Sequence, residues 1–248
     1  MEGCQQFHSK TVKHNDLDAY EHTLKMAQGK HPLVLVIIDG VYSQDGDLAP
    51  LSEIAALCKR HNARLMVDNT HGTGVVGKIR RGPIEACNAW DDVDLISGTF
   101  SKTFAHVGGY VVASEEMVNY LKYQSKQHLF SASLPPGALA IVKAIELIDE
   151  EPAWRSFLQD NIRYFRKGLE SLGLMIGPTE SAIFPVRIGG KTKNAKICHA
   201  LQKGVYTNQI NYPAVSLKDA RIRMGVKRSS TSLAHRKDGF DTYAKSGR

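Results

Sequence analysis

Short apolar segments alternate with amphipathic segments along the first half of the chain, and this alternation restricts the possible fold more than any other feature. Leu33–Ile38 has the length and the Val/Ile content of a buried strand. Leu65–Val67, Asp94–Ile96 and Tyr110–Ala113 are further strand candidates. Helices are expected between them over Asp16–Ala27, Pro50–His61 and Glu115–Gln127. Strands that alternate with helices predict an α/β layer built on a mostly parallel sheet.

The character of the chain changes after Pro135-Pro136. We therefore expect a large domain over residues 1–136, followed by a linking helix and a smaller α+β domain over residues 137–248. In the second part, helices are predicted over Ala138–Asp149 and Trp154–Leu172, and a terminal helix over Leu233–Ala244. Short strands are predicted over Ala182–Ile188, Gly204–Asn208 and Ala220–Gly225.

Composition excludes several classes of protein. No apolar run among the 248 residues is long enough to span a membrane, and no charged-then-apolar start predicts a secretory signal. The cysteines lie far apart and form no C-x-x-C pair, so neither a disulfide framework nor a metal site is expected. A reducing cytoplasm is the default location for such a chain.

The net charge is +7, and its basic residues are spread along the chain apart from a cluster formed by Lys227, Arg228, Arg236 and Lys237. The simplest interpretation is a soluble protein with a solvated tail. A second interpretation is attraction of a polyanionic substrate such as a coenzyme A thioester. Nucleic-acid binding is not expected, because no recognised motif accompanies the charge.

Candidate site residues follow the predicted strands. Ser43, Asp68, His71 and Lys102 all lie at or just beyond strand ends, where ligands collect in parallel sheets. This combination suits pyridoxal 5′-phosphate (PLP). The lysine can form a Schiff base with the aldehyde, and the aspartate can keep the pyridine nitrogen protonated, so that the ring becomes an electron sink.

Each residue also has a simpler explanation. Lys102 could be a surface lysine, but it lies between two hydroxyl residues with glycines close behind, and Thr99 and Ser101 can donate hydrogen bonds to a phosphate. Asp68 could be a turn aspartate, and the role of His71 depends on Asp68. For Ser43 the two explanations are evenly balanced.

Two arginines complete the candidate set. Arg221 and Arg223 alternate with Ile222 in a predicted strand and so point the same way. One of them could clamp a substrate carboxylate through two hydrogen bonds. The alternative is the exposed edge of a small sheet.

Several segments in order resemble the α-oxoamine synthases, a branch of the fold-type I PLP enzymes. They are Asp39–Asp47 (DGVYSQDGD), Asp68–Gly74 (DNTHGTG), Gly98–Gly109 (GTFSKTFAHVGG), His128–Pro136 (HLFSASLPP) and Gly204–Arg223 (GVYTNQINYPAVSLKDARIR). The resemblance runs from about His14 to the C-terminus. Within the branch the motifs are most similar to bacterial serine palmitoyltransferases, which implies a role in sphingolipid biosynthesis.

The resemblance implies condensation of an amino acid with an acyl-CoA, with loss of carbon dioxide in some members. Lys102 would hold the cofactor and move protons, Asp68 would pair with the pyridine nitrogen, and His71 would contact the ring oxygen. Ser43 and Thr99 would help to place the ring and phosphate. Ser131 and Ser133 would reach the phosphate of the neighbouring subunit in a homodimer with shared active sites. Arg223 would bind the carboxylate of the amino acid.

The chain departs from the family pattern at Asp39, Asn69, Thr70 and Gly72, where the family usually has Glu, an acidic residue, Ala and Ser. These changes surround the ring and leave open another PLP reaction, such as that of an aminotransferase, racemase or aldolase. Family members also carry a long segment before the region that matches His14, with a glycine-rich turn and a stacking aromatic residue. Its absence here leaves open a fragment, completion by another chain, or a non-catalytic subunit of a synthase complex.

Overall fold

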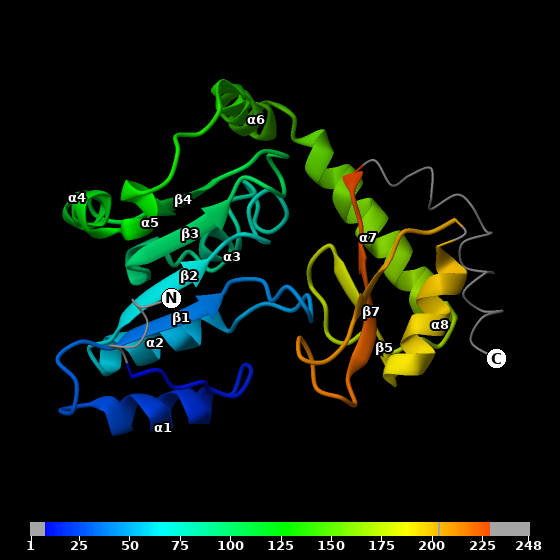
Figure 1. Cartoon of the computed structure of the whole chain (residues 1–248), viewed down its shortest axis with the longest axis horizontal. Coiled ribbons are helices and arrows are strands. Elements are labelled where there is room, and N and C mark those ends of the chain that lie inside the picture. Colours follow the sequence, from blue (N-terminus) through cyan, green and yellow to red (C-terminus); the bar gives the residue numbers. More distant parts are fainter. Residues whose placement is uncertain (1–7, 203, 229–248) are drawn as a thin grey trace.

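A four-stranded sheet forms the centre of the first part of the molecule (Figure 1). The structure is a computed structural model and describes residues 8–202 and 204–228. The strands are β1 (Leu35–Asp39), β2 (Arg64–Asp68), β3 (Leu95–Thr99) and β4 (Gly109–Val112), in the order β1-β2-β3-β4. The first three are parallel and β4 is antiparallel to β3. The predicted α/β fold with a mostly parallel sheet is therefore confirmed.

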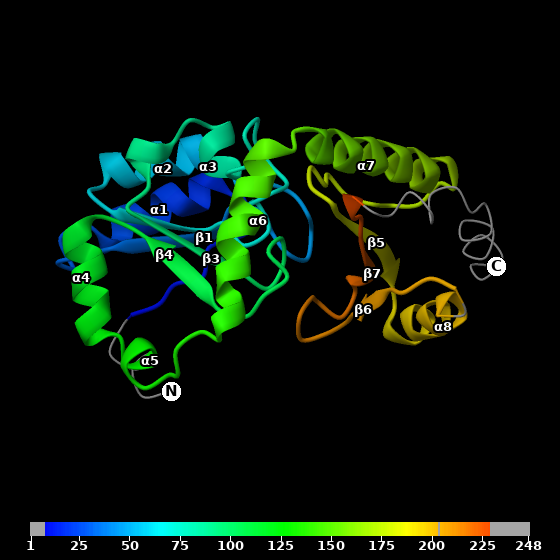
Figure 2. The same ribbon diagram turned by 90° about the horizontal axis from the view of Figure 1, so that it is seen from above.

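One face of this sheet is covered by helices and forms the first core. The helices are α1 (Leu17–Ala27), α2 (Leu51–Arg60) and the short α3 (Pro83–Ala86), seen together on one side in Figure 2. Asp16 caps α1 by accepting a hydrogen bond from the backbone N–H of Ala19 at 3.1 Å. The core contains side chains from both layers, among them Ile38, Ile54, Leu65, Val67 and Ile84. Burial of alternate strand residues against amphipathic helices is what holds this layer together.

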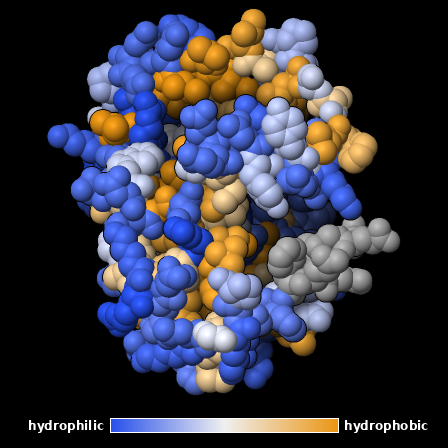
Figure 3. Space-filling model, turned by 90° about the vertical axis from the view of Figure 1, so that its left-hand side faces the viewer, coloured by the Kyte–Doolittle hydropathy of each residue, from blue (hydrophilic) through white to orange (hydrophobic). Residues whose placement is uncertain are grey.

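The opposite face of the same sheet is largely open. Leu35 and Ile37 on β1 are 44% and 63% exposed, and Val111 on β4 is 45% exposed. Alternation along the strands places these side chains opposite the helix-covered core. Figure 3 shows apolar side chains exposed in patches among hydrophilic ones on one side of the molecule. An uncovered apolar sheet face of this kind is typical of a surface that meets other polypeptide.

Three helices lead from the first sheet to the second. They are α4 (Glu115–Gln124), α6 (Leu139–Glu150) and the long α7 (Ala153–Ser171); the short α5 (Lys126–Leu129) and the turn Pro136–Ala138 lie between α4 and α6. Ser125 interrupts the single helix expected over Glu115–Gln127, because its hydroxyl accepts from the N–H of His128 at 3.3 Å and starts a new turn.

A second, antiparallel sheet has the order β5-β7-β6, with β5 (Ile183–Gly189), β6 (Asn208–Ile210) and β7 (Ala220–Gly225). Its core packs α7 and α8 (Lys191–Leu201) against the sheet through residues such as Leu169, Phe184 and Ile222. The strand predicted over Gly204–Asn208 is wrong: pairing begins only at Asn208, opposite Arg223 of β7. The predicted helix over Leu233–Ala244 lies outside the described residues.

Helix α8 was not predicted, because few apolar residues mark its buried side. Asn194 takes a core position there, fully buried, and donates hydrogen bonds to the carbonyl oxygen of Arg221 at 3.0 Å and to that of Ile210 at 3.3 Å. A polar side chain thus connects α8 to the sheet.

Two further expectations concern the described residues only. None of their helices has the length and apolar character that crossing a membrane requires. Cys58, Cys87 and Cys198 are free thiols.

Candidate active site

The carboxyl ends of β1 and β2 bring two carboxylates side by side. Asp39 and Asp68 are register partners, and Ser97 of β3 is the next partner in the same row. All three lie on the open face of the sheet, because they alternate with the buried residues of the core. Burial raises the pKa of Asp39, and the charge of Asp68 raises it further. A cation placed at this edge would relieve that crowding of negative charge.

Asp68 is held by the chain that follows it. Its Oδ1 atom accepts a hydrogen bond from the backbone N–H of Thr70 at 2.7 Å. The side chain is half-buried. A turn begins at this point, in which the N–H groups of Gly72 and Thr73 both bond to the carbonyl oxygen of Asn69. This turn carries His71.

His71 is half-buried and is electrically neutral near pH 7. Burial, followed by the positive charges of Lys102 and Arg223, lowers its pKa to about 4, and the charge of Asp68 opposes this shift. These effects place the imidazole within electrostatic range of all three charged side chains. The structure therefore brings together the lysine, aspartate, histidine and arginine that the sequence suggested.

Lys102 lies in the turn that joins β3 to β4. The turn is closed by hydrogen bonds from Phe100 N–H to the Gly108 carbonyl at 2.9 Å and from His106 N–H to the Phe100 carbonyl at 2.8 Å. The lysine side chain is exposed. Its positive charge lowers the pKa of Asp39 as well as that of His71.

The lysine turn and the histidine turn are tied directly to each other. The Thr103 hydroxyl donates to the carbonyl oxygen of Thr73 at 2.7 Å, and the Thr73 hydroxyl lies 3.0 Å from that of Tyr110. A Cβ atom at Gly74 would lie 2.4 Å from the Thr103 methyl group, so the two segments approach as closely as glycine allows. These contacts were not predicted from the sequence, although Thr73 and Thr103 lie close to the predicted site residues His71 and Lys102.

Asn69 and Gly72, two residues that depart from the family pattern, lie against each other. Asn69 is 4% exposed and donates from Nδ2 to the carbonyl oxygen of Arg81 at 2.6 Å. A Cβ atom at Gly72 would lie 2.3 Å from Asn69 Oδ1 and 2.4 Å from Pro83 Cδ. The serine usual in the family does not fit here without movement of these neighbours.

The two predicted arginines have different surroundings. Arg221 is 4% exposed, and its guanidinium is bound to Asp45 and to the carbonyl oxygen of Gln44. Arg223 is half-buried, and its Nε donates to the carbonyl oxygen of Ser43 at 2.6 Å. Burial lowers the pKa of Arg223. Its positive charge lowers the pKa of His71, whereas the guanidinium of Arg221 is bound by the loop after β1.

The predicted phosphate-binding hydroxyls are partly engaged with each other. Thr99 Oγ1 donates to the carbonyl oxygen of Gly108 at 3.0 Å and lies 2.9 Å from Ser101 Oγ. The Ser101 N–H also points to Thr99 Oγ1 at 3.2 Å. These hydroxyls adjoin Lys102, and rotation of the exposed Ser101 side chain would free its donor for an anion.

Ser131 and Ser133 lie in the exposed stretch between α5 and the turn Pro136–Ala138. The stretch passes close to the lysine turn, since a Cβ atom at Gly108 would lie 2.5 Å from Leu134 Cδ2. The Ser131 hydroxyl contacts only its own segment among the described residues, donating to the His128 carbonyl at 3.5 Å. Their assignment to a neighbouring subunit's cofactor stays a prediction.

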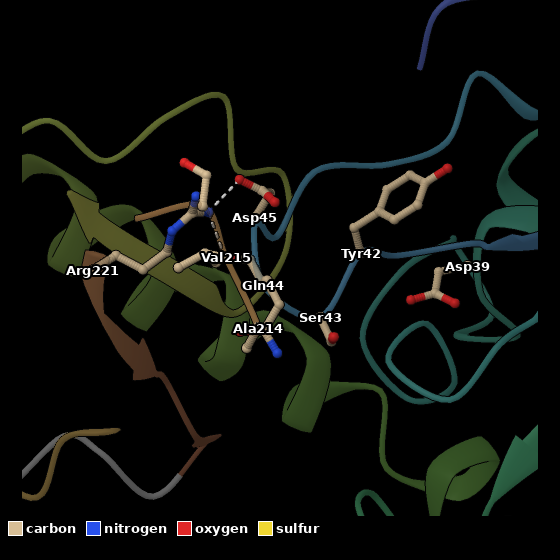
Figure 4. A pocket seen from close by; sticks show the side chains of 9 residues that line it. Asp39, Tyr42, Ser43, Gln44, Asp45, Ala214, Val215 and Arg221 are labelled. Carbon is tan, nitrogen blue, oxygen red and sulfur yellow. Dashed lines mark hydrogen bonds and ion pairs between the residues drawn. The ribbon is translucent and has the colours of Figure 1, made fainter. Parts of the chain in front are cut away.

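A cavity of about 290 Å³ adjoins the site between the two sheets. The loop after β1 and the loop before β7 line it, with Asp39, Tyr42, Ser43, Gln44, Asp45, Ala214, Val215, Ser216 and Arg221. Figure 4 shows Arg221 and Asp45 joined on one side of this space and Asp39 on the other. Asp45 was not among the predicted site residues, although it lies two residues after Ser43.

The sequence of the chain also matches a known protein family. The family model described as aminotransferase class I and II matches residues 2–235. The chain belongs to the aminotransferase class I and II family.

Relatives narrow the class to the α-oxoamine synthases, as the motifs predicted. The chain is 36% identical over 249 residues to an 8-amino-7-oxononanoate synthase of Thermoanaerobacter pseudethanolicus, covering 99% of this chain and 62% of that protein. It is 36% identical over 231 residues to a serine palmitoyltransferase of Bacteroides ovatus, covering 92% and 57%. The chain thus spans about three fifths of the length of these curated relatives.

Solved structures agree in fold. A high-resolution structure of SPT with the PLP internal aldimine has a TM-score of 0.91 and 30% identity, covering 100% of this chain and 63% of that chain. A second, described as Sphingomonas wittichii serine palmitoyltransferase, has a TM-score of 0.86 and 29% identity, covering 96% and 60%.

Proposed function

We propose that this chain binds PLP and forms the cofactor-binding part of an acyltransferase of the α-oxoamine synthase type. The observation that supports this most is that Asp68, His71 and Lys102 lie at the carboxyl edge of the first sheet, with Arg223 of β7 near enough to lower the pKa of His71. The relatives' names, 8-amino-7-oxononanoate synthase and serine palmitoyltransferase, support the same class of reaction.

The residues present suit the cofactor. The pKa of Asp39 is raised by burial and by the neighbouring Asp68, so the edge favours a cation between the carboxylates and the lysine. A protonated pyridine nitrogen is such a cation. The turn after β3 offers an amine for an aldehyde from Lys102 and two hydroxyls for a phosphate from Thr99 and Ser101.

When bound, PLP supplies an electron sink for negative charge at the α-carbon of an amino acid. Asp68 would keep the pyridine nitrogen protonated, and the neutral His71 would meet the ring without adding charge. Lys102 would hold the cofactor through its amine and would move the proton at the α-carbon of the amino acid. Arg223 binds the carboxylate and so orients the amino acid.

In a reaction of the α-oxoamine synthase type, the acyl acceptor is an amino acid and the acyl donor is an acyl-CoA. The deprotonated α-carbon of the amino acid attacks the thioester carbonyl, a carbon–carbon bond forms, the carbon–sulfur bond breaks, and coenzyme A leaves as the thiol. We propose that the carboxylate is then lost as carbon dioxide. The relatives include enzymes named for two different products, so the amino acid and the acyl chain are left open here.

The cofactor is tested by absorbance and mass. Purified protein mixed with PLP should gain a band near that of a protonated Schiff base, and borohydride reduction should leave a stable adduct on the peptide that contains Lys102. Lys102→Ala should lack both. The same adduct in Lys102→Ala, or an adduct on another lysine, would refute the assignment.

The reaction is tested by product. Protein loaded with PLP should release free coenzyme A when given an amino acid and an acyl-CoA. The family also contains aminotransferases, as its description states. Amino-group transfer to a keto acid without release of coenzyme A would instead support that alternative.

A second candidate function is that of a subunit that works only with another polypeptide. The open sheet face with Leu35, Ile37 and Val111 favours it. A homodimer is part of this proposal, with Ser131 and Ser133 reaching the partner's cofactor. Gel filtration alone and together with a full-length relative would show which assembly forms, and a monomer in both runs would contradict it.

A further inference from the structure

The short loop after β1 contacts arginines of the second sheet. The carboxylate of Asp45, in the loop after β1, binds the guanidinium of Arg221 on the central strand β7. The same carboxylate lies 3.8 Å from Arg187 on the neighbouring strand β5. The loop thereby connects the carboxyl edge of the first sheet to the face of the second (Figure 4).

The two arginines that meet Asp45 differ in burial. The side chain of Arg221 is 5% exposed and that of Arg187 is 44% exposed. A buried guanidinium needs a partner of opposite charge, so of these two contacts the one between Arg221 and Asp45 is the one that holds the loop against β7. The contact of Arg187 is screened by water and restrains little.

Arg221 and Arg223 are two residues apart on one strand, and both point to the loop. Arg223 uses its Nε for the carbonyl oxygen of Ser43, at 2.6 Å. Its terminal nitrogens make no hydrogen bond recorded within the described part of the chain. Restraining Arg221 therefore also sets where those free donors point.

The structure assigns to Asp45 the role of a positioning residue for the substrate arginine, an inference that rests on the proposed function. Through Arg221 the carboxylate holds β7 so that the free nitrogens of Arg223 face the strand ends, where an amino-acid carboxylate would bind. The same contact forms one wall of the cavity of about 290 Å³ between the sheets. Asp45 itself touches neither the substrate nor the reacting atoms.

The test measures recognition of the carboxylate rather than turnover. Calorimetry of the PLP-loaded protein compares L-alanine with L-alaninamide, and L-serine with L-serinamide. If Arg223 pairs with the carboxylate of the amino acid, the wild type should bind the amino acid roughly tenfold or more tightly than its amide. Asp45→Asn should reduce the preference to about one, whereas Asp45→Glu should restore most of it and Arg187→Gln should leave it unchanged.

A second variant tests whether a loss of this preference comes merely from a loss of the fold. Asp45→Asn leaves a buried guanidinium without its carboxylate, so the double variant Asp45→Asn/Arg221→Gln removes that charge as well. Circular dichroism confirms folding, and the preference should be lost in the double variant too. Full preference in either folded variant would overturn the inference.

The NMR titration of His71 needs no cofactor, so it tests the role of Asp45 separately from the proposed function. Arg223 lowers the pKa of His71, so its displacement should raise the midpoint of the His71 NMR titration in Asp45→Asn but not in Arg187→Gln. An unchanged midpoint in Asp45→Asn would count against Asp45. A raised midpoint, with no PLP adduct even in the wild type, would refute the cofactor assignment and with it the substrate role of Arg223.

Discussion

Acidification should destabilise this protein through His71, and the effect can be isolated by substitution. Burial and two nearby positive charges lower the pKa of His71 from 6.5 to about 4. As pH falls from 6.5 toward 4, the unfolded chain takes up the proton before the folded chain does. Stability from the neutral imidazole is therefore complete above about pH 6.5 and is lost as pH falls toward 4.

The size of the loss follows from the same values. The full difference corresponds to at most about 3 kcal/mol. His71 is only half-buried, so solvent screening reduces this to about 1–2 kcal/mol. His71→Gln removes the titrating group, and its free energy of unfolding should therefore fall less between pH 7 and pH 4.5 than that of the wild type.

Urea unfolding at several pH values provides the measurement. The wild type should lose about 1–2 kcal/mol more than His71→Gln over that interval. His22→Gln, at an exposed position on α1, is the matched control and should follow the wild type. Parallel stability curves for the wild type and His71→Gln would refute the argument, and so would an NMR titration midpoint of His71 near 6.5.

Three other predictions concern the fold around the site. Gly72→Ser should lower the free energy of unfolding by about 1–3 kcal/mol, because its Cβ would lie 2.3 Å from Asn69 Oδ1; a thermal melt matching the wild type would contradict this. Asn194→Ala should cost about 1–3 kcal/mol in urea unfolding, because buried carbonyls lose their donor; a change below about 0.5 kcal/mol would argue against the hydrogen bonds. Ile37→Lys on the open sheet face should change stability by less than about 0.5 kcal/mol but reduce binding of an apolar dye, and unchanged dye fluorescence would show that this face is covered.

Local patterns predicted most of the first sheet correctly. The helix over Asp16–Ala27 and, in the second sheet, the strand over Ala220–Gly225 were also found, because amphipathic periodicity and alternation are local properties of the chain. Helix α8 was missed because a buried asparagine occupies a core position that apolar periodicity does not reveal. The strand expected at Gly204–Asn208 failed because pairing with β7 decides where β6 begins.

For the candidate site as well, the sequence predicted some residues and the tertiary structure decided between others. Strand ends identified Asp68 and Lys102 as candidates, since parallel strands present their carboxyl ends at one edge. The choice between Arg221 and Arg223 could not be made from alternation, because both point to one face. Only the loop that buries Arg221 against Asp45 distinguishes them.

The order of residues along the chain was enough to specify the alternating layers, the chemistry of the candidate groups and the family. The layers and the chemistry depend on periodicity and residue type, which act over a few neighbours, and the family was indicated by the resemblance of several motifs in order. The neutral state of His71, the close fit of Gly72 against Asn69 and the contact between Asp45 and Arg221 depended on folding. Each arises from groups distant in the chain, whose burial and charge take effect only when packing excludes water between them.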